Sequence, residues 1–183
     1  MKMVLVVRNR QRGFTLIEIA IVLVIVGLLI GGALKGQEML QNAKLKSLIQ
    51  DLDGVTAAHY AYQERMGGMA GDVTNVNGMI DDEAAFWIAQ REQGFLKGDP
   101  ASGASPLHSL GGVLEVGSGT VAAGRNWVCA SLIDSGQAEG LDRRYDDGKG
   151  NSGFLVWAGG GDNPAAMADY PDNDVVGFFC KLF

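Results

Sequence analysis

Histidine, the side chain most often used in general acid–base catalysis, is scarce in this sequence. It contains two histidines among 183 residues, His59 and His108, and neither lies in a nucleophile motif or in the spacing of a metal site. The glycine triplet at 159–161 lacks the lysine and the following serine or threonine of a phosphate-binding loop. We therefore expect satisfied or solvated histidines, no catalytic residue and no cofactor.

Acidic residues are absent from the first 13 positions. These positions carry four of the 15 basic residues, Lys2, Arg8, Arg10 and Arg12, and all 21 acidic residues follow them. A basic N-terminal segment is typical of the cytoplasmic side of a membrane. The acidic remainder argues against nucleic acid as a partner of this chain, since binding to phosphates needs a basic surface.

Residues 14–34 form a nearly continuous apolar run with a single charge, Glu18. At about 1.5 Å per residue, a helix of this run would extend roughly 30 Å, the thickness of one bilayer core. Beyond it, apolar and aromatic residues recur at steps of three and four, which predicts a stripe on one helix face: Leu45, Leu48, Leu52, Val55, His59 and Tyr62. We expect one helix with a membrane-spanning half at 14–35 and an amphipathic half at 36–66 that packs on a soluble domain.

Two features of the apolar run have competing explanations. Gly27 and Gly31, like Gly32 and Gly36, are small residues four apart. They either let helices approach closely or reflect the abundance of glycine in membrane helices. A carboxylate such as Glu18 costs about 2.5 to 3.5 kcal/mol within hydrocarbon. It therefore either has a partner or lies near the interface in contact with water.

The six residues GFTLIE at 13–18, after a short basic leader and directly before the apolar helix, resemble the processing site of type IV prepilins and related pseudopilins. The resemblance implies that a prepilin peptidase removes a leader of residues 1–13 by cutting between Gly13 and Phe14. The same enzyme then methylates the new amine of Phe14. The apolar helix is retained, unlike an ordinary secretory signal. The resemblance also implies that Glu18 pairs with the terminal amine of a neighbouring subunit during filament assembly.

The chain departs from the family pattern in two respects. Many type IV pilins have a proline in the lower half of the span, whereas the first proline here is Pro100. The four glycines of the span are candidates to loosen the helix instead, because a glycine costs about 1 kcal/mol relative to alanine in a helix interior. The leader is also longer than the shortest in the family, and a start at Met3 would shorten it by two residues.

The remaining residues, 67–183, predict a globular α+β region. Acids at 81–83 precede a predicted helix at 84–95, with Phe86, Trp87 and Phe95 as its apolar anchors. Glycine-bounded apolar runs predict three or four short antiparallel strands against the amphipathic half of the long helix, at 113–116, 126–133, 154–157 and 175–183. A long helix backed by a small sheet is also the fold that the resemblance to pilins implies.

Cys129 and Cys180 lie in two of the predicted strands. In an exported region, two cysteines predict one disulfide, with two buried thiols as the alternative. Many pilins have a C-terminal disulfide, whereas pseudopilins of secretion systems usually lack one. The pair therefore favours a pilus.

Acidic and amide residues gather between the two cysteines. Asp146, Asp147, Asp172 and Asp174 are candidate calcium ligands, because calcium binds six to eight oxygens. No ordered ligand spacing such as an EF-hand loop is present. Solvated loop acids are the simpler explanation, so we expect no metal.

The resemblance implies a structural subunit of a type IV pilus. Such a subunit is a single-pass protein of the bacterial inner membrane, with its body in the periplasm, until it is assembled into an extracellular helical filament. Its partners would be copies of itself or related pilins, the prepilin peptidase, the inner-membrane pilus assembly machinery and, before assembly, the membrane. A pseudopilin of a type II secretion system and a low-copy minor pilin are the alternatives.

Overall fold

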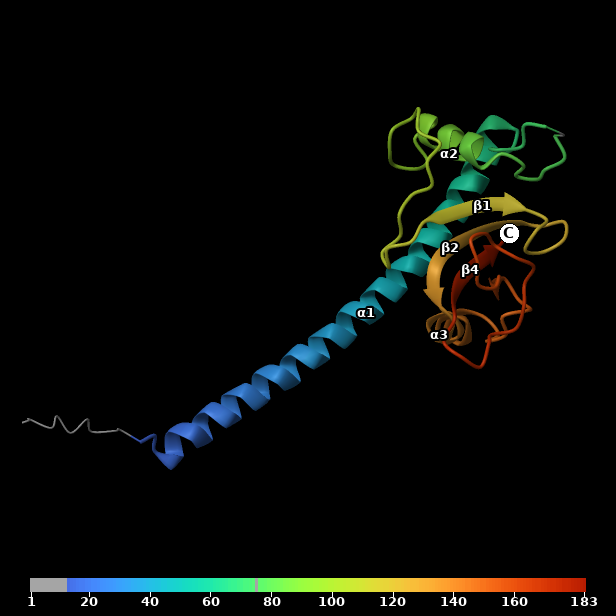
Figure 1. The fold of residues 1–183 in the computed structure, drawn as a ribbon. Coiled ribbons are helices and arrows are strands. Elements are labelled where there is room, and N and C mark those ends of the chain that lie inside the picture. Colours follow the sequence, from blue (N-terminus) through green and yellow to red (C-terminus); the bar gives the residue numbers. More distant parts are fainter. Residues whose placement is uncertain (1–12, 75) are drawn as a thin grey trace, which may run out of the picture. The chain divides into compact units, whose positions relative to one another are not determined.

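The computed structural model describes residues 13–74 and 76–183 (Figure 1). Residues 1–12, and with them nearly all of the predicted leader, lie outside the described part of the chain. The elements follow in the order α1 (Leu16–Met66), α2 (Glu83–Glu92), β1 (Leu114–Ser118), β2 (Asn126–Asp134), α3 (Ser135–Tyr145), β3 (Leu155–Trp157) and β4 (Val176–Leu182). By its contacts the chain divides into two compact units, Met1–Gln41 and Asn42–Phe183.

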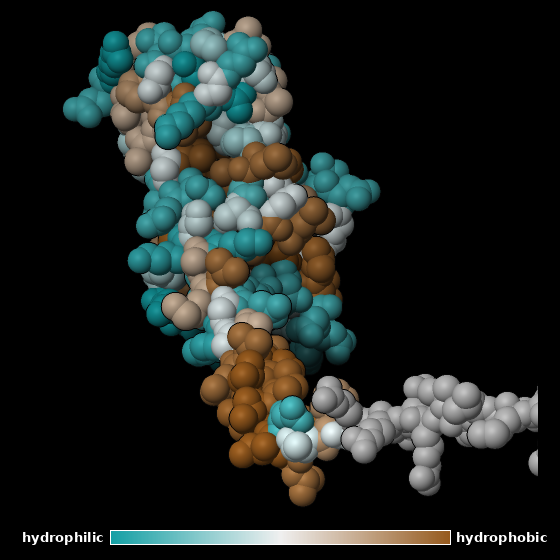
Figure 2. All heavy atoms as spheres, turned by 90° about the vertical axis from the view of Figure 1, so that its left-hand side faces the viewer, coloured by the Kyte–Doolittle hydropathy of each residue, from teal (hydrophilic) through white to brown (hydrophobic). Residues whose placement is uncertain are grey.

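The first unit presents the apolar part of α1. Its residues from 13 to 41 are exposed apart from Gly36, which is half-buried. Figure 2 shows this stretch as a largely hydrophobic surface. The helix is long and apolar enough to cross a membrane, and none of its most apolar stretch is buried among the described residues. An apolar surface of this size needs lipid or other apolar helices around it.

The second unit is built on a four-stranded antiparallel sheet in the order β1-β2-β4-β3. Val128 and Phe179 on one face of this sheet belong to the same hydrophobic core as Leu48 and Leu52 of α1. The buried residues of α1 form one stripe, as predicted: Leu48, Ile49, Leu52, Val55, Thr56, Ala58 and His59. The α+β fold expected from the sequence, a long helix packed on a small antiparallel sheet, is confirmed.

The opposite face of the sheet holds a second core. Successive residues of a strand point to opposite faces, so Trp127 and Cys129 of β2 lie here, together with Phe178 and Cys180 of β4. The segment between β1 and β2 contributes Val121 to this cluster. The sheet is therefore covered on both faces.

The helix after the acids at 81–83 is shorter than predicted. It begins after its N-cap, Asp82, and ends at Glu92 rather than at residue 95. Gly94 follows with a φ of 75°, a conformation that ends helices because glycine adopts it without strain. Phe95 lies after this turn and is half-buried. The other two predicted anchors are fully buried: Phe86 and Trp87. The four strands are present, with bounds that differ from those predicted by at most two residues.

The sequence pattern does not predict α3. This helix begins after Asp134, whose carboxylate accepts hydrogen bonds from the N–H groups of Gly136 and Gln137. It adds Ala138 and Leu141 to the main core. Two apolar contacts in an 11-residue segment with glycines at 136 and 140 give no clear helical periodicity, so packing on the sheet stabilises this helix.

Candidate processing and assembly site

Hydrogen bonds between Thr15 and Glu18 close the first turn of α1. Glu18 Oε2 accepts hydrogen bonds from the Thr15 backbone N–H at 2.8 Å and from the Thr15 hydroxyl at 2.7 Å. In return, Thr15 Oγ1 accepts a hydrogen bond from the Glu18 N–H at 3.3 Å. The Thr15 carbonyl accepts a further bond from the N–H of Ile19. This reciprocal arrangement is a capping box, with Thr15 as the N-cap and Glu18 at the third helical position.

The predicted scissile bond lies just outside the helix. Gly13, Phe14 and Thr15 are not helical, and α1 begins at Leu16. Phe14 is 85% exposed, and it lines a shallow surface groove together with Ile19. These two residues occupy the positions of a hydrophobic staple, in which the residue before the N-cap packs against the fourth helical residue.

Gly27, Gly31, Gly32 and Gly36 lie on the surface of α1. A Cβ atom built at any of the four positions meets nothing within 4 Å beyond the adjoining residues and backbone of the helix itself. Among the described residues, nothing packs against these glycines. Their close packing on another helix stays a prediction.

The residues around this turn have a recognised signature. Residues 8–34 match the family model described as the prokaryotic N-terminal methylation motif. The match is consistent with a prepilin-type protein. It covers the capping box and the whole apolar run. No curated protein and no solved structure gave a significant match.

The motif has consequences for processing and location. It implies cleavage by a prepilin peptidase and assembly into pilus-like filaments. Together with the exposed apolar helix, it supports membrane anchoring. It points to a structural pilin-type protein rather than to an enzyme.

Cys129 and Cys180 form a disulfide. The two residues lie directly opposite each other on β2 and β4. Both are fully buried in the second core. The disulfide expected from the two cysteines is therefore present, and it ties the last strand of the chain to the middle of the sheet.

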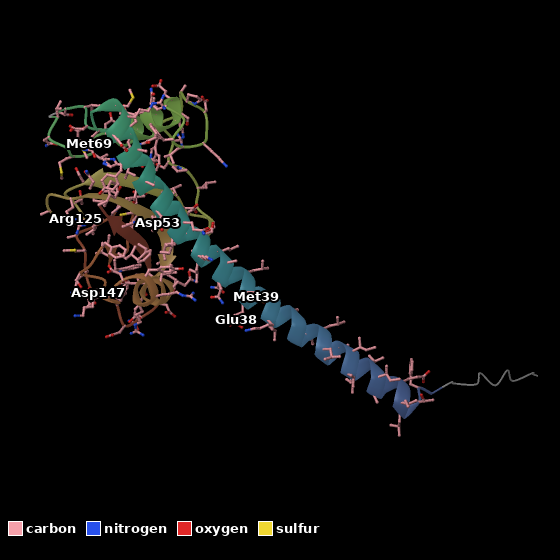
Figure 3. The ribbon with its side chains drawn as sticks, turned by 180° about the vertical axis from the view of Figure 1, so that it is seen from behind. Glu38, Met39, Asp53, Met69, Arg125 and Asp147 are labelled. Carbon is pink, nitrogen blue, oxygen red and sulfur yellow. A yellow bond between two sulfur atoms is a disulfide. The ribbon has the colours of Figure 1, made fainter. Side chains whose placement is uncertain are left out.

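Asp147 lies in the loop after α3 (Figure 3). Its carboxylate comes within 4.8 Å of those of Asp142 and Asp146. Of the four calcium candidates, this cluster contains Asp146 and Asp147, whereas Asp172 and Asp174 do not belong to it. All three carboxylates accept hydrogen bonds from the chain itself: Asp142 from Gly148 and Tyr170, Asp146 from Phe154 and Leu155, and Asp147 from Lys149 and Ser152.

The two histidines are buried in different environments. The Nε2 of His108 lies 2.8 Å from the carbonyl oxygen of Ser131, and its Nδ1 accepts a hydrogen bond from the Leu110 N–H. His108 is thus a satisfied histidine with its proton on Nε2. Neither ring nitrogen of His59 has a hydrogen-bond partner among the described residues. The expectation that His59 would be satisfied or solvated is therefore wrong, because the helix stripe places it in the apolar core.

Thr15 is the site residue that the sequence interpretation missed. A threonine followed three residues later by a glutamate, just before an apolar run, is the sequence signature of a capping box. The pattern from Thr15 to Glu18 therefore carried the signal. Glu18 is therefore a hydrogen-bond acceptor of the first helical turn as well as a charge.

Proposed function

We propose that this chain is a structural subunit of a type IV pilus. It is held in the bacterial inner membrane, with its body in the periplasm, and is assembled into a helical filament through its N-terminal helix. A prepilin peptidase cleaves it between Gly13 and Phe14 and methylates the new amine of Phe14. Its partners are copies of itself or related pilins and the inner-membrane assembly machinery.

The placement of Glu18 is the observation that supports this proposal most directly. Its hydrogen bonds to the described residues all use Oε2, which leaves Oε1 for a partner from another chain. Cleavage creates a cationic amine on Phe14, and methylation keeps that charge. Inside an apolar helical bundle, the carboxylate and the amine of a neighbouring copy stabilise each other, because either charge alone would be costly. The pair would then set the register of each added subunit.

The apolar half of α1 supports the same assembly. Its exposed side chains find a second apolar environment when helices of several copies pack together outside the membrane. The glycines at 27, 31, 32 and 36 leave room for a neighbouring helix at close distance. The buried disulfide suits a body that works in an oxidising environment, and it favours a pilus over a secretion pseudopilus.

The direct test is to shear surface filaments from cells that express the chain, and to identify their subunits by imaging and mass spectrometry. We expect an abundant chain that begins at a methylated Phe14. Absence of the processed chain from the filaments would contradict the pilus function. Its presence at a few copies per filament would identify a minor pilin instead.

A variant separates the charge of Glu18 from its capping role. Glu18→Gln keeps the capping box, since glutamine serves equally at the third position, but cannot pair with a cation. We expect normal insertion and cleavage, and a filament yield lower by at least about tenfold, the equivalent of losing roughly 1.4 kcal/mol.

The matched control for this variant lies on the same helix. Glu38 pairs with Lys35 at 2.7 Å, and both side chains are largely exposed. Exposed pairs of this kind contribute little, so Glu38→Gln should assemble like the wild type. A normal filament yield from Glu18→Gln would overturn the role assigned to the Glu18 charge.

A further inference from the structure

We propose that Thr15 is a positioning residue for the prepilin peptidase, because its N-cap ends α1 immediately after the scissile bond and keeps that bond out of the helix. This inference rests on the proposed function, in which Gly13–Phe14 is the bond that is cut. Hydrolysis adds one water across this bond and leaves a carboxylate on Gly13 and an ammonium group on Phe14. The peptidase supplies the catalytic groups, whereas this chain determines the backbone conformation around the bond that is cut.

The geometry of the first turn sets where the helix begins. An N-cap residue has a non-helical backbone, and its side chain takes the place of the preceding turn of helix as a hydrogen-bond partner. Thr15 does this through its hydroxyl, which accepts the Glu18 N–H, while Glu18 Oε2 accepts the Thr15 N–H. Both N–H groups would otherwise need carbonyl partners from residues 11 and 14. Once the capping box forms, both N–H groups have acceptors, so no hydrogen bond is gained when residues 13 and 14 become helical.

A stop signal matters at this position because the surroundings favour helix. In an apolar medium, backbone N–H and C=O groups must be satisfied within the segment, which drives a helix to continue as far as it can. A peptide bond inside an α-helix is closed to a peptidase, since cleavage takes place on locally open chain. The chain needs a helix that is stable in lipid and, within three residues of it, a peptide bond that is open to hydrolysis. The capping box allows both, because it ends the helix just after that bond.

The staple positions favour the same start of the helix. Phe14 and Ile19 line one groove and occupy the two positions of a hydrophobic staple, a pairing that fixes the angle at which a chain enters a helix. Gly13, with no side chain, adds little helix propensity of its own. Three residues precede Leu16: Gly13, Phe14 and Thr15. Of these, only Thr15 has a side chain that makes hydrogen bonds.

The test uses full-length chains in membrane vesicles, with the rate of leader removal by prepilin peptidase as the first readout. Thr15→Ala removes the cap and favours helix, whereas Thr15→Ser and Thr15→Asn keep a strong N-cap. We expect Thr15→Ala to be cleaved about fivefold more slowly, in line with the usual contribution of an N-cap. The Ser and Asn variants should stay within about twofold of the wild type.

The asparagine variant distinguishes capping from direct contact with the enzyme. It caps the helix without a hydroxyl, so a cleavage rate as slow as that of Thr15→Ala would overturn the proposal in favour of hydroxyl recognition. A normal rate for Thr15→Ala would overturn it as well. The second readout is amide hydrogen exchange of residues 14–18 in the uncleaved chains, which should show helix extended through Phe14 only in Thr15→Ala. If the wild type itself is not cleaved, the proposed function fails, and the exchange data still decide whether Thr15 sets the start of the helix.

Discussion

The imidazole of His59 and the ring of Phe183 lie with their centroids 4.9 Å apart. The contact joins the amphipathic part of α1 to the residue that follows β4. The same imidazole stacks on Phe86 from the region of α2, with 6.1 Å between centroids. Burial among these rings lowers the pKa of His59 below its ordinary value of 6.5, because the charged imidazolium would lose its hydration.

Acid should therefore destabilise the globular body through His59. Because its pKa is lower in the folded chain, the unfolded chain binds the proton more readily. The contribution to stability is fully present above the unfolded pKa of about 6.5 and is lost as the pH falls towards the folded pKa. We expect the melting temperature of the full chain in detergent micelles to fall between about pH 7 and about pH 5.

His59→Leu removes this titration together with two buried ring nitrogens that have no hydrogen-bond partner in the described part of the chain. We expect the variant to lose less melting temperature on acidification, and to be at least as stable as the wild type near pH 5, since an apolar group replaces an unsatisfied polar one. The pKa of His108 is also lowered by burial, so some acid sensitivity remains in both proteins. Equal acid sensitivity of the two proteins would contradict the role of His59.

Leu132 adopts a left-handed backbone conformation within β2, with a φ of 58°. It lies at the irregularity between Ala130 and Ile133 in the pairing with β4, and its side chain is 65% exposed. This conformation costs a leucine about 1 to 2 kcal/mol but costs a glycine almost nothing. We expect Leu132→Gly to raise the free energy of unfolding by about 0.5 to 1 kcal/mol, after the entropy that glycine gains in the unfolded chain is subtracted.

Leu132→Ala is the matched control for this prediction. It removes the same exposed apolar surface but keeps a side chain at the strained position, so it should not stabilise the protein. The measurement is chemical denaturation of the three proteins in the same detergent. A glycine variant no more stable than the alanine variant would show that the backbone at this position carries no strain.

The contrast between α1 and α3 shows which parts of this fold are visible in the sequence. The apolar run and the three-and-four spacing of α1 are local patterns that extend over many turns, so they predict that this segment is a helix. The glycines at 67, 68 and 71 break the pattern and predict its end near residue 66. In α3, local propensity is weak, and the helix depends on Asp134 at its start and on contacts with the sheet. Such contacts are formed by residues distant in sequence, which no local pattern encodes.

The same distinction applies to the candidate site. Gly13, Phe14 and Glu18 belong to a short ordered motif, and Thr15 belongs to a capping pattern, so all four are accessible from the sequence. The unpaired imidazole of His59, which has no hydrogen-bond partner within residues 13–74 and 76–183, is different, because it depends on the side chains that segments distant in sequence place around the ring. The irregularity at Leu132 cannot be predicted from the sequence either. An apolar run does not show where its backbone departs from regular strand pairing.

The acidic cluster of Asp142, Asp146 and Asp147 should be independent of calcium. Its carboxylates already accept hydrogen bonds from the chain, among them the Tyr170 hydroxyl at 2.9 Å from Asp142. We expect millimolar calcium, or its removal by a chelator, to change the melting temperature by less than about 1 °C, as for a ligand that does not bind the folded state. A rise of several degrees that Asp147→Asn abolishes and Asp172→Asn preserves would contradict this and identify the cluster as a metal site.

The disulfide between Cys129 and Cys180 should be a major contribution to the stability of the body. It closes a separation of 51 residues, and the chain-entropy model gives about 4 kcal/mol for a loop of this size. For a chain of this length, reduction should lower the melting temperature by about 10 °C.

A double Cys129→Ala and Cys180→Ala variant should melt near the reduced wild type and should not respond to reductant. The backbone pairing of β2 with β4 and the core around α1 use neither sulfur atom, so both proteins should remain folded at room temperature. If reductant lowers the melting temperature of the double variant as much as that of the wild type, the loss arises elsewhere and the disulfide contributes little.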